Sequence, residues 1–427
     1  MRTFLESVNL NNTKDLNTLT APIIVYFKVT GCCNLMCSFC SQSDLKKKNM
    51  DIDEAKKLLS ELKETGVISI NYTGGEPLVY PKILELVKYG NELGFEQTLV
   101  TNGINLLKNE EVLKYINTIG ISLHGKPDIH DKLCNKKGTF KLIENNIDTI
   151  QKKYPKILIN INCTLTKENI NEKNMLFLKD FCKKKNIKLC FGRLNYLGLA
   201  SKKEIINPND YLSLIHNIKN EYSNISISNC VASCICDEKY KYLNHACGAG
   251  TTIFSIEPNG DVKICPSSKY ILGNAFEQKF NKIIKKSELK NYKKLNWLPN
   301  VCRICKDFEH CKGGCHAEGN YKFYQNTCDA LLIDKLQRAW KIIENQKVIL
   351  KTTKLRKEKN KYLIIKVPLR KIDKSGYEVL KSINGSISCK ELVEKFNKIE
   401  NIKDFLCTLY IEGIIGVKNE KKTNRKW

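Results

Sequence analysis

The sequence predicts an α/β fold built around a parallel barrel or part-barrel. Short runs rich in β-branched residues alternate with amphipathic stretches between about residues 23 and 192. Six strand–helix repeats at a spacing of roughly 25–35 residues are typical of this class. The predicted strands are Ile23–Val29, Val67–Tyr72, Gln97–Thr101, Thr118–Leu123, Ile157–Leu165 and Ile187–Phe191. Functional residues in such folds lie on the loops after the carboxyl ends of the strands, so we look for them there.

Helical and hairpin patterns complete the outline of the chain. The clearest helix begins at Asp51, and Ile52, Ala55, Leu58, Leu59 and Leu62 share one of its faces. Further patterns predict a helix at Pro208–Glu221, a hairpin over Thr251–Ile264 and a helix at Ala330–Lys347. We therefore expect a barrel domain (1–195), a connector (196–246), a cysteine-rich domain with a following helix (247–348) and a small C-terminal module (349–427).

Composition narrows the class of protein. Hydrophobic residues make up 42 % of the 427 residues, which excludes global disorder. No apolar run approaches the roughly 18 residues of a membrane-spanning helix, and the first residues lack a secretory signal, so we expect a cytoplasmic protein. In a reducing compartment, 20 cysteines favour bound metal over disulfides. The net charge of +26 suggests either a nucleic-acid partner or a lysine-rich surface.

Three cysteines follow the first predicted strand. Cys33, Cys37 and Cys40 have the spacing C-x3-C-x2-C. Three thiolates on one loop suit three irons of a [4Fe–4S] cluster and leave the fourth iron without a protein ligand. An open iron of this kind can bind and reduce an external ligand.

The next three strands also end in polar or glycine-rich segments. They are residues 73–77 (Thr-Gly-Gly-Glu-Pro), 101–103 (Thr-Asn-Gly, which contains Asn102) and 122–125 (Ser-Leu-His-Gly). Glycines permit close approach of the backbone to a ligand, and exposed backbone groups can bind the amine and carboxylate of an amino acid. Because these loops share an edge of the barrel with the cysteines, we expect a single ligand site.

The three cysteines, Phe39 before the last of them, and Gly74-Gly75-Glu76-Pro77 together resemble the radical S-adenosylmethionine (radical SAM) superfamily over about residues 22–195. The resemblance implies a partial (β/α)6 barrel whose cluster cleaves S-adenosylmethionine to a 5′-deoxyadenosyl radical. It also implies contacts from Gly74, Gly75, Glu76 and Pro77 to the methionine amine and from Phe39 to adenine. Ser122 and Arg193 would help to hold the ribose and the carboxylate.

A second cysteine block begins at Cys247, which is followed by Gly260-x4-Cys265. It continues with a C-x2-C-x5-C-x3-C run, formed by Cys302, Cys305, Cys311 and Cys315. The block ends at Cys328. Zinc is the competing metal, because closed four-thiolate zinc sites are common. Seven cysteines cannot fill two four-ligand sites, and this number suits iron–sulfur centres with one position open or borrowed.

The block resembles the SPASM extension of radical SAM enzymes, which carries two auxiliary [4Fe–4S] clusters. By position, the resemblance assigns Cys302, Cys305, Cys311 and Cys328 to an outer cluster and Cys247, Cys265 and Cys315 to an inner one. Some relatives add a fourth inner ligand upstream, and Cys230, Cys234 and Cys236 lie in that region without the spacing choosing among them. Sulfatase-maturing members carry an acidic residue directly after the cysteine that corresponds to Cys265. This chain has Pro266, which disfavours formylglycine formation.

The C-terminal segment 361–417 resembles the RiPP recognition element, a winged-helix module that captures leader peptides by adding them to a sheet as a strand. A DNA-binding winged helix is the alternative. Residues 371–412 contain seven basic and seven acidic residues, whereas the flank 351–370 has eight basic residues against one acidic. Because a helix that reads a DNA groove should itself be basic, the charge distribution favours a peptide partner.

The sequence thus predicts a radical SAM enzyme with three [4Fe–4S] clusters and S-adenosylmethionine that modifies a ribosomally synthesised precursor peptide. We expect a thioether crosslink as product and a flavodoxin or ferredoxin as reductant. The alternatives are carbon–carbon or carbon–oxygen crosslinking or epimerisation of a peptide, and an iron–sulfur redox regulator that binds DNA.

Overall fold

The computed structural model describes most of the chain. The described residues are 19–43, 47–194, 197–199, 206–295, 297–298, 302, 305, 307–316, 330–351, 354–358, 361–365, 370–372, 374–399, 402–411 and 414–418. Of the predicted site residues, Cys328 lies outside these ranges.

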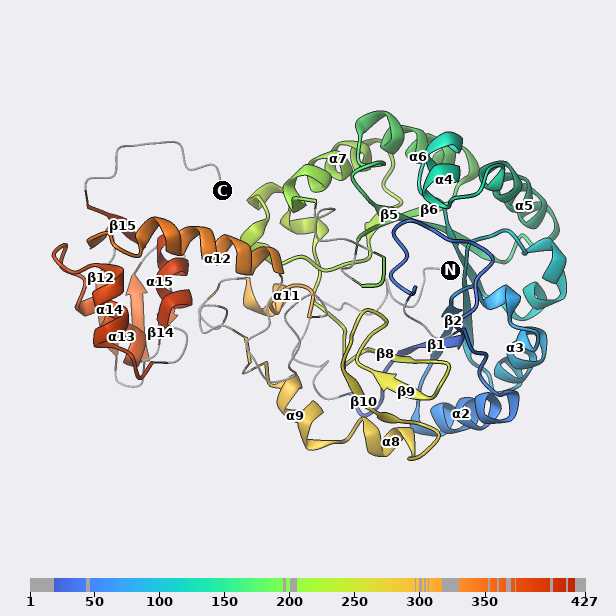
Figure 1. Cartoon of the computed structure of the whole chain (residues 1–427), viewed down its shortest axis with the longest axis horizontal. Helices are drawn as coiled ribbons and strands as arrows, with labels where there is room; N and C mark the ends of the chain where they lie inside the picture. Colours follow the sequence, from blue (N-terminus) through green and yellow to red (C-terminus); the bar gives the residue numbers. More distant parts are fainter. Residues whose placement is uncertain are drawn as a thin grey trace.

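A ten-stranded sheet curves into the barrel in the order β10-β9-β8-β1-β2-β3-β4-β5-β6-β7 (Figure 1). Its strands are β1 (Ile24–Thr30), β2 (Ser69–Gly74), β3 (Glu96–Thr101), β4 (Thr118–Ser122), β5 (Leu158–Leu165), β6 (Lys188–Arg193), β7 (Ile225–Ile227), β8 (Ile253–Ile256), β9 (Asp261–Lys263) and β10 (Ile271–Asn274). All pairs from β8 through β7 in this order are parallel. The six predicted strands are confirmed, and the sheet continues beyond them on both sides.

Helices cover the outside of the barrel (Figure 1). They are α2 (Ile52–Thr65), α3 (Ile83–Glu92), α4 (Pro127–Leu133), α5 (Thr139–Lys153), α6 (Glu172–Lys185) and α7 (Pro208–Glu221), with short 3-10 turns at Pro77–Val79, Leu107–Tyr115, Ser233–Ile235 and Glu238–Leu243. Asp51 caps α2 by accepting hydrogen bonds from the amides of Asp53 and Glu54, as the sequence indicates.

Alternation along β1 separates an apolar face from a polar one. Val25, Phe27 and Val29 are fully buried in the core between sheet and helices. Tyr26 and Lys28 lie on the opposite face, toward the inside of the barrel, because successive side chains of a strand point to opposite sides. The strand therefore carries polar groups into the interior just before the cysteine loop.

The predicted hairpin joins the barrel directly. Its first strand, β8, pairs in parallel with β1 and its second, β9, pairs antiparallel with β8. Cys265 follows β9, so the same sheet carries both cysteine regions. The rest of this region contains the short helices α8 (Phe280–Ile283), α9 (Ser287–Lys293) and α11 (Phe308–Cys311).

A separate lobe forms the C-terminal part of the chain and is reached through helix α12 (Figure 1). Its elements are α12 (Ala330–Ile343), β11 (Val348–Leu350), β12 (Lys354–Glu358), β13 (Lys361–Ile365), β14 (Arg370–Ile372), α13 (Lys374–Lys381), α14 (Cys389–Lys395), α15 (Ile402–Ile411) and β15 (Ile415–Val417). Strands β12, β13 and β14 form one antiparallel sheet, and β11 pairs with β15. The predicted order of a strand, three helices and a final strand is present, whereas the assignment to a winged helix stays a prediction.

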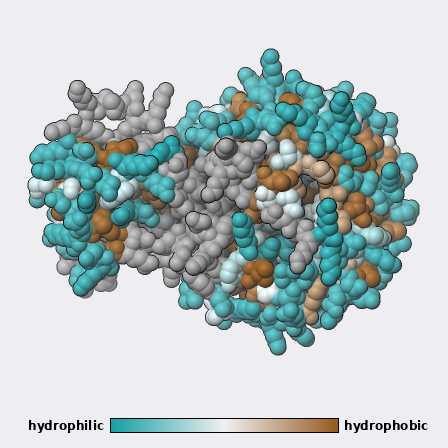
Figure 2. Space-filling model, in the orientation of Figure 1, coloured by the Kyte–Doolittle hydropathy of each residue, from teal (hydrophilic) through white to brown (hydrophobic). Residues whose placement is uncertain are grey.

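The surface is rich in charged side chains. The face of the molecule in Figure 2 is largely hydrophilic, with smaller hydrophobic areas near the middle of the barrel. Among the described helices, none has the length and hydropathy needed to cross a membrane.

Candidate active site and iron–sulfur ligands

The three-cysteine loop is fixed to the barrel by backbone hydrogen bonds. The amide of Ser38 donates to the carbonyl of Leu133 at 3.0 Å, and the amide of Cys40 donates to the carbonyl of Cys37 at 3.2 Å. Cys33 is exposed, whereas Cys37 and Cys40 are half-buried. Although the residue as a whole is exposed, partial desolvation of its sulfur raises the pKa of the Cys33 thiol to about 11, and the neighbouring Cys37 and Cys40 act in the same direction. The Cys37 and Cys40 thiols are thus near enough to that of Cys33 to act on it electrostatically, and a cation bound among the three would favour their deprotonated forms.

The glycine segment after β2 packs against this loop. The amide of Gly75 donates to the carbonyl of Thr30 at 2.8 Å, and the amide of Glu76 donates to the carbonyl of Cys32 at 2.8 Å. A Cβ atom on Gly74 would lie 2.2 Å from the Thr30 carbonyl oxygen, and one on Gly75 would lie 2.2 Å from that of Cys32. Both glycines are required because backbone atoms occupy the space of a side chain.

The Gly75→Ala substitution should therefore separate the two loops. Since the clashing atom is a backbone oxygen that cannot rotate away, we expect a loss of about 1–3 kcal/mol in the free energy of unfolding. Urea unfolding of the purified protein measures this loss. The Gly138→Ala variant is the matched control, because a Cβ atom there meets nothing within 4 Å even though its φ of +79° adds some strain. Equal stability losses in both variants would contradict the packing argument.

Glu76 is buried at the centre of the strand ends. Its Oε1 accepts hydrogen bonds from the Thr101 hydroxyl at 2.7 Å and from the Leu78 amide at 3.0 Å, and its Oε2 accepts one from the Asn102 amide at 2.7 Å. Burial raises the pKa of Glu76 to about 7 despite these donors. The Asn102 side chain also donates to Oδ1 of Asn34 at 2.7 Å. Loops that follow β1, β2 and β3 thus meet around one carboxylate, as the sequence predicts.

The remaining predicted contacts lie at the same ends of the strands. Phe39 is buried, and its ring meets that of His124 edge to face with centroids 4.7 Å apart. Ser122 is the last residue of β4, and Arg193 is the buried last residue of β6. The structure thus places Phe39 and residues from the ends of β2, β3, β4 and β6 at the same edge of the sheet, where the strands end.

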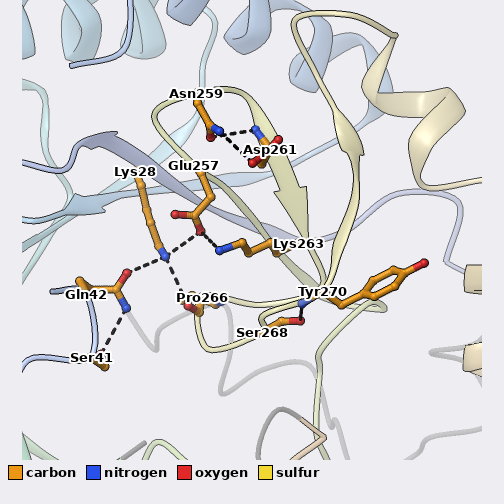
Figure 3. A network of polar contacts seen from close by, with 10 residues as sticks. All are labelled: Lys28, Ser41, Gln42, Glu257, Asn259, Asp261, Lys263, Pro266, Ser268 and Tyr270. Atoms are coloured by element: carbon orange, nitrogen blue, oxygen red, sulfur yellow. Dashed lines mark hydrogen bonds and ion pairs between the residues drawn. The ribbon is translucent and has the colours of Figure 1, made fainter. Parts of the chain in front are cut away.

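A buried ion pair that sequence reasoning missed lies next to this site. Lys28 on β1 is only 2 % exposed, and its Nζ lies 2.8 Å from Oε1 of Glu257 (Figure 3). The same Nζ donates to Oε1 of Gln42 at 2.7 Å and to the carbonyl of Pro266 at 3.3 Å. Lys263 approaches the Glu257 carboxylate from the other side at 3.2 Å. Burial lowers the pKa of Lys28, and the negative charge of Glu257 opposes that effect.

The contacts of Lys28 connect the two cysteine regions. Gln42 comes two residues after Cys40, and Pro266 directly follows Cys265. One ammonium group therefore fixes the end of each loop to the same strand. A signal was available in the sequence, because a lysine is unexpected within an apolar strand between Phe27 and Val29.

The predicted inner ligands Cys247, Cys265 and Cys315 lie near one another, close to the end of β9. Cys265 and Cys315 are buried, Cys247 is half-buried, and a cavity of about 200 Å³ opens beside Cys247. Burial is the main cause of the raised pKa of Cys265, and the nearby thiols of Cys247 and Cys315 add to it. Thiol sulfur is the donor that iron–sulfur centres prefer, so this set fits such a cluster.

His316, directly after Cys315, supports the inner set. Its Nδ1 lies 2.6 Å from the Tyr292 hydroxyl, and its Nε2 lies 2.6 Å from the Lys312 carbonyl. The imidazole also contributes to the lowered pKa of the Cys247 thiol, behind the larger effect of Cys230. Neighbours of this kind orient metal ligands.

The outer set is only partly described. The amide of Cys305 donates to the carbonyl of Cys302 at 3.2 Å, and Cys311 is buried and accepts a hydrogen bond from the Ser233 amide at 3.2 Å. Cys328 lies outside the described residues. Within the part of the chain that is described, no three His, Cys, Asp or Glu side chains form a ready site for a single metal ion.

Comparison with known proteins agrees with this arrangement. Residues 27–178 match the radical SAM superfamily and residues 247–307 match the SPASM iron–sulfur cluster-binding domain. The chain is 26 % identical to the AdoMet-dependent heme synthase of Methanosarcina barkeri (70 % of this chain, 92 % of that protein) and 26 % identical to the PqqA peptide cyclase of Bradyrhizobium diazoefficiens (70 % and 83 %).

Solved structures share the fold. Streptococcus suis SuiB bound to S-adenosylmethionine is 20 % identical with a TM-score of 0.61, over 74 % of this chain and 79 % of that one. The structure of anSMEcpe with bound AdoMet is 22 % identical with a TM-score of 0.54, over 72 % and 89 %. The two matched domains imply iron–sulfur clusters and S-adenosylmethionine as cofactors. The chain therefore belongs to the radical SAM superfamily, as an enzyme whose barrel is followed by a SPASM iron–sulfur domain.

Proposed function

We propose that this enzyme is a peptide maturase that acts on a ribosomally synthesised precursor. The observation that carries the proposal is the single sheet that bears a SAM-type cysteine loop after β1 and an inner thiol group after β9. The similarity to a peptide cyclase supports it, as does the fold shared with SuiB, which has also been solved bound to the precursor peptide SuiA.

Cys33, Cys37 and Cys40 would hold the first [4Fe–4S] cluster through three of its irons. When bound, that cluster supplies the electron that cleaves S-adenosylmethionine to a 5′-deoxyadenosyl radical. The chain's own residues position the cofactor. The Glu76 carboxylate, with the backbone of Gly74, Gly75 and Pro77, would bind the methionine amine. We assign Phe39 to adenine, and Asn102, Ser122 and Arg193 to the polar parts of the cofactor.

Two auxiliary [4Fe–4S] clusters would complete a total of three. The outer one would use Cys302, Cys305, Cys311 and Cys328, and the inner one Cys247, Cys265 and Cys315. Residues 1–195, 247–348 and 349–427 would then be the barrel, cluster and peptide-binding domains, with 196–246 as connector.

The reaction we propose is formation of a thioether between a cysteine sulfur and a carbon of the precursor. In this reaction the carbon would lose a hydrogen atom to the 5′-deoxyadenosyl radical and the thiol would lose a proton to solvent. An auxiliary cluster would accept the one electron released as the carbon–sulfur bond forms. The product is therefore about 2 Da lighter than the precursor, since two hydrogens leave. Carbon–carbon and carbon–oxygen crosslinks give the same mass change, and epimerisation gives none.

Incubation of the reduced enzyme with S-adenosylmethionine and precursor peptide tests this function. We expect 5′-deoxyadenosine and a peptide lighter by about 2 Da, with fragmentation that places the lost mass at a cysteine. Iodoacetamide labelling separates the bond types, because a thioether removes one reactive thiol and the other crosslinks do not. An unchanged mass together with deuterium uptake would replace crosslinking by epimerisation.

We propose that the leader peptide binds the C-terminal lobe as an additional strand on the sheet β12-β13-β14, whose outer strands β12 and β14 each pair with one neighbour among the described strands. A leader peptide without the modified segment should then inhibit modification of the full precursor competitively, which raises KM without changing kcat. Double-stranded DNA of the neighbouring promoter should have no such effect. Tight DNA binding without any effect of the leader would favour the redox regulator.

A further inference from the structure

A fourth thiol lies within the inner cysteine group. Cys230 is buried, and its thiol lies close enough to those of Cys247 and Cys315 to interact with both. Tyr292, which borders the group, lies close enough to interact electrostatically with all four thiols, including that of Cys265. The thiol of Cys230 is thus part of this group although it comes 17 residues before Cys247 in the chain.

Packing holds Cys230 at this position. The amide of the next residue, Val231, donates to Oδ1 of Asn244 at 2.8 Å. This hydrogen bond holds the segment next to Asn244, which comes three residues before Cys247 in the chain. On the other side, a Cβ atom on Gly314 would lie 2.5 Å from the backbone nitrogen of Ala232. The segment after Cys230 therefore rests in backbone contact with the turn that carries Cys315.

The two other upstream cysteines, Cys234 and Cys236, lie in a turn that contacts the predicted outer ligand Cys311. Ser233, which precedes Cys234, donates its amide to the sulfur of Cys311, a predicted outer ligand. The thiol of Cys236 donates to the carbonyl of Ala232 at 3.6 Å, within its own turn. The turn that contains Cys234 and Cys236 thus lies toward the outer set, whereas Cys230 lies with the inner one.

We propose that Cys230 is the fourth protein ligand of the inner auxiliary cluster, together with Cys247, Cys265 and Cys315. The inner cluster then has a thiolate on every iron and no position for a substrate sulfur. Its role is to accept an electron, while the substrate cysteine reacts without binding to iron. This inference rests on the proposed function, because it assigns a ligand to a cluster that the proposed function requires.

The test uses the full-length chain with Cys33, Cys37 and Cys40 all replaced by alanine, so that only the auxiliary clusters remain. Iron and sulfide analysis should give about eight of each per chain, as two [4Fe–4S] clusters require. In this background we expect the electron paramagnetic resonance spectrum of the reduced protein to be unchanged by added 2-mercaptoethanol. A spectrum that responds to the thiol would overturn the proposal, because it would reveal an open iron.

Variants then identify the ligand. In the same background, Cys230→Ala should create an open iron, so that 2-mercaptoethanol now changes the spectrum, and Cys230→Ser should give a shifted spectrum with a full iron content. The matched control is Cys236→Ala, which should leave the inner signal and its lack of response unchanged. A response in Cys236→Ala but none in Cys230→Ala would assign the ligand elsewhere. An iron content of zero in the background protein would instead contradict the proposed function itself.

Discussion

The Lys28→Met variant should lose about 3–5 kcal/mol of unfolding free energy, because it removes one partner of a buried ion pair and leaves the Glu257 carboxylate without its nearest cation. We expect a value near the lower end, since Lys263 stays 3.2 Å from that carboxylate. The same change also releases Gln42 and Pro266 from their shared donor. Urea unfolding under anaerobic conditions measures the loss.

Two further variants separate the charge from the packing. The Lys263 side chain contacts the same carboxylate but is 18 % exposed. We therefore expect Lys263→Met to lower the free energy of unfolding by about 1 kcal/mol or less. The double variant Lys28→Met/Glu257→Gln should recover part of the stability, because no buried carboxylate is then left without its cation. Equal losses of unfolding free energy in Lys28→Met and Lys263→Met would show that the deeper burial of Lys28 does not increase its contribution to stability.

Affinity for S-adenosylmethionine should fall by up to about tenfold for each pH unit below 7. The reason is that Glu76, whose pKa burial raises to about 7, becomes protonated there and loses the charge that we assign to the methionine amine. Stability of the free protein should change in the opposite direction. Since the folded-state pKa lies above that of an unfolded glutamate, the contribution of Glu76 to stability is fully present at pH 4.5 and below and is lost as the pH rises through 7.

Calorimetric titration of S-adenosylmethionine between pH 5.5 and 8 tests the binding part of this prediction. Glu76→Gln should bind more weakly at pH 8 and show little dependence on pH, because the amide keeps the shape but cannot ionise. Glu61→Gln is a suitable control, since Glu61 lies on α2, away from the strand ends. An affinity of the unaltered enzyme that is flat across pH 7 would argue against a charged contact from Glu76.

The strands and the first site were predictable because both depend on local patterns. Parallel strands that are buried on both faces show runs of β-branched residues, and functional loops follow such strands at fixed positions. The glycines at 74 and 75 are recognisable in the same way, since a loop that contacts another backbone excludes side chains.

Contacts between distant segments could not be predicted. Lys28 and Glu257 are 229 residues apart, and neither a lysine in a strand nor a glutamate in a turn indicates its partner. The position of Cys230 in the inner group likewise depends on how residues 230–233 pack against Asn244 and the turn at Gly314, which has no periodic signal in the sequence. The three-residue strand β7 was missed for a related reason, because a run of that length has no pattern of its own.

The pairing of β8 with β1 fixes more than topology. Because four consecutive residues of each strand are in parallel register, the hairpin that carries Cys265 cannot swing away from the barrel without breaking the sheet. Electron tunnelling depends steeply on the separation of donor and acceptor. For the reaction and the inner auxiliary cluster that we propose, the rate of electron transfer from the substrate radical to that cluster should therefore be insensitive to solvent viscosity, unlike that of an enzyme whose redox domains must move together in each turnover.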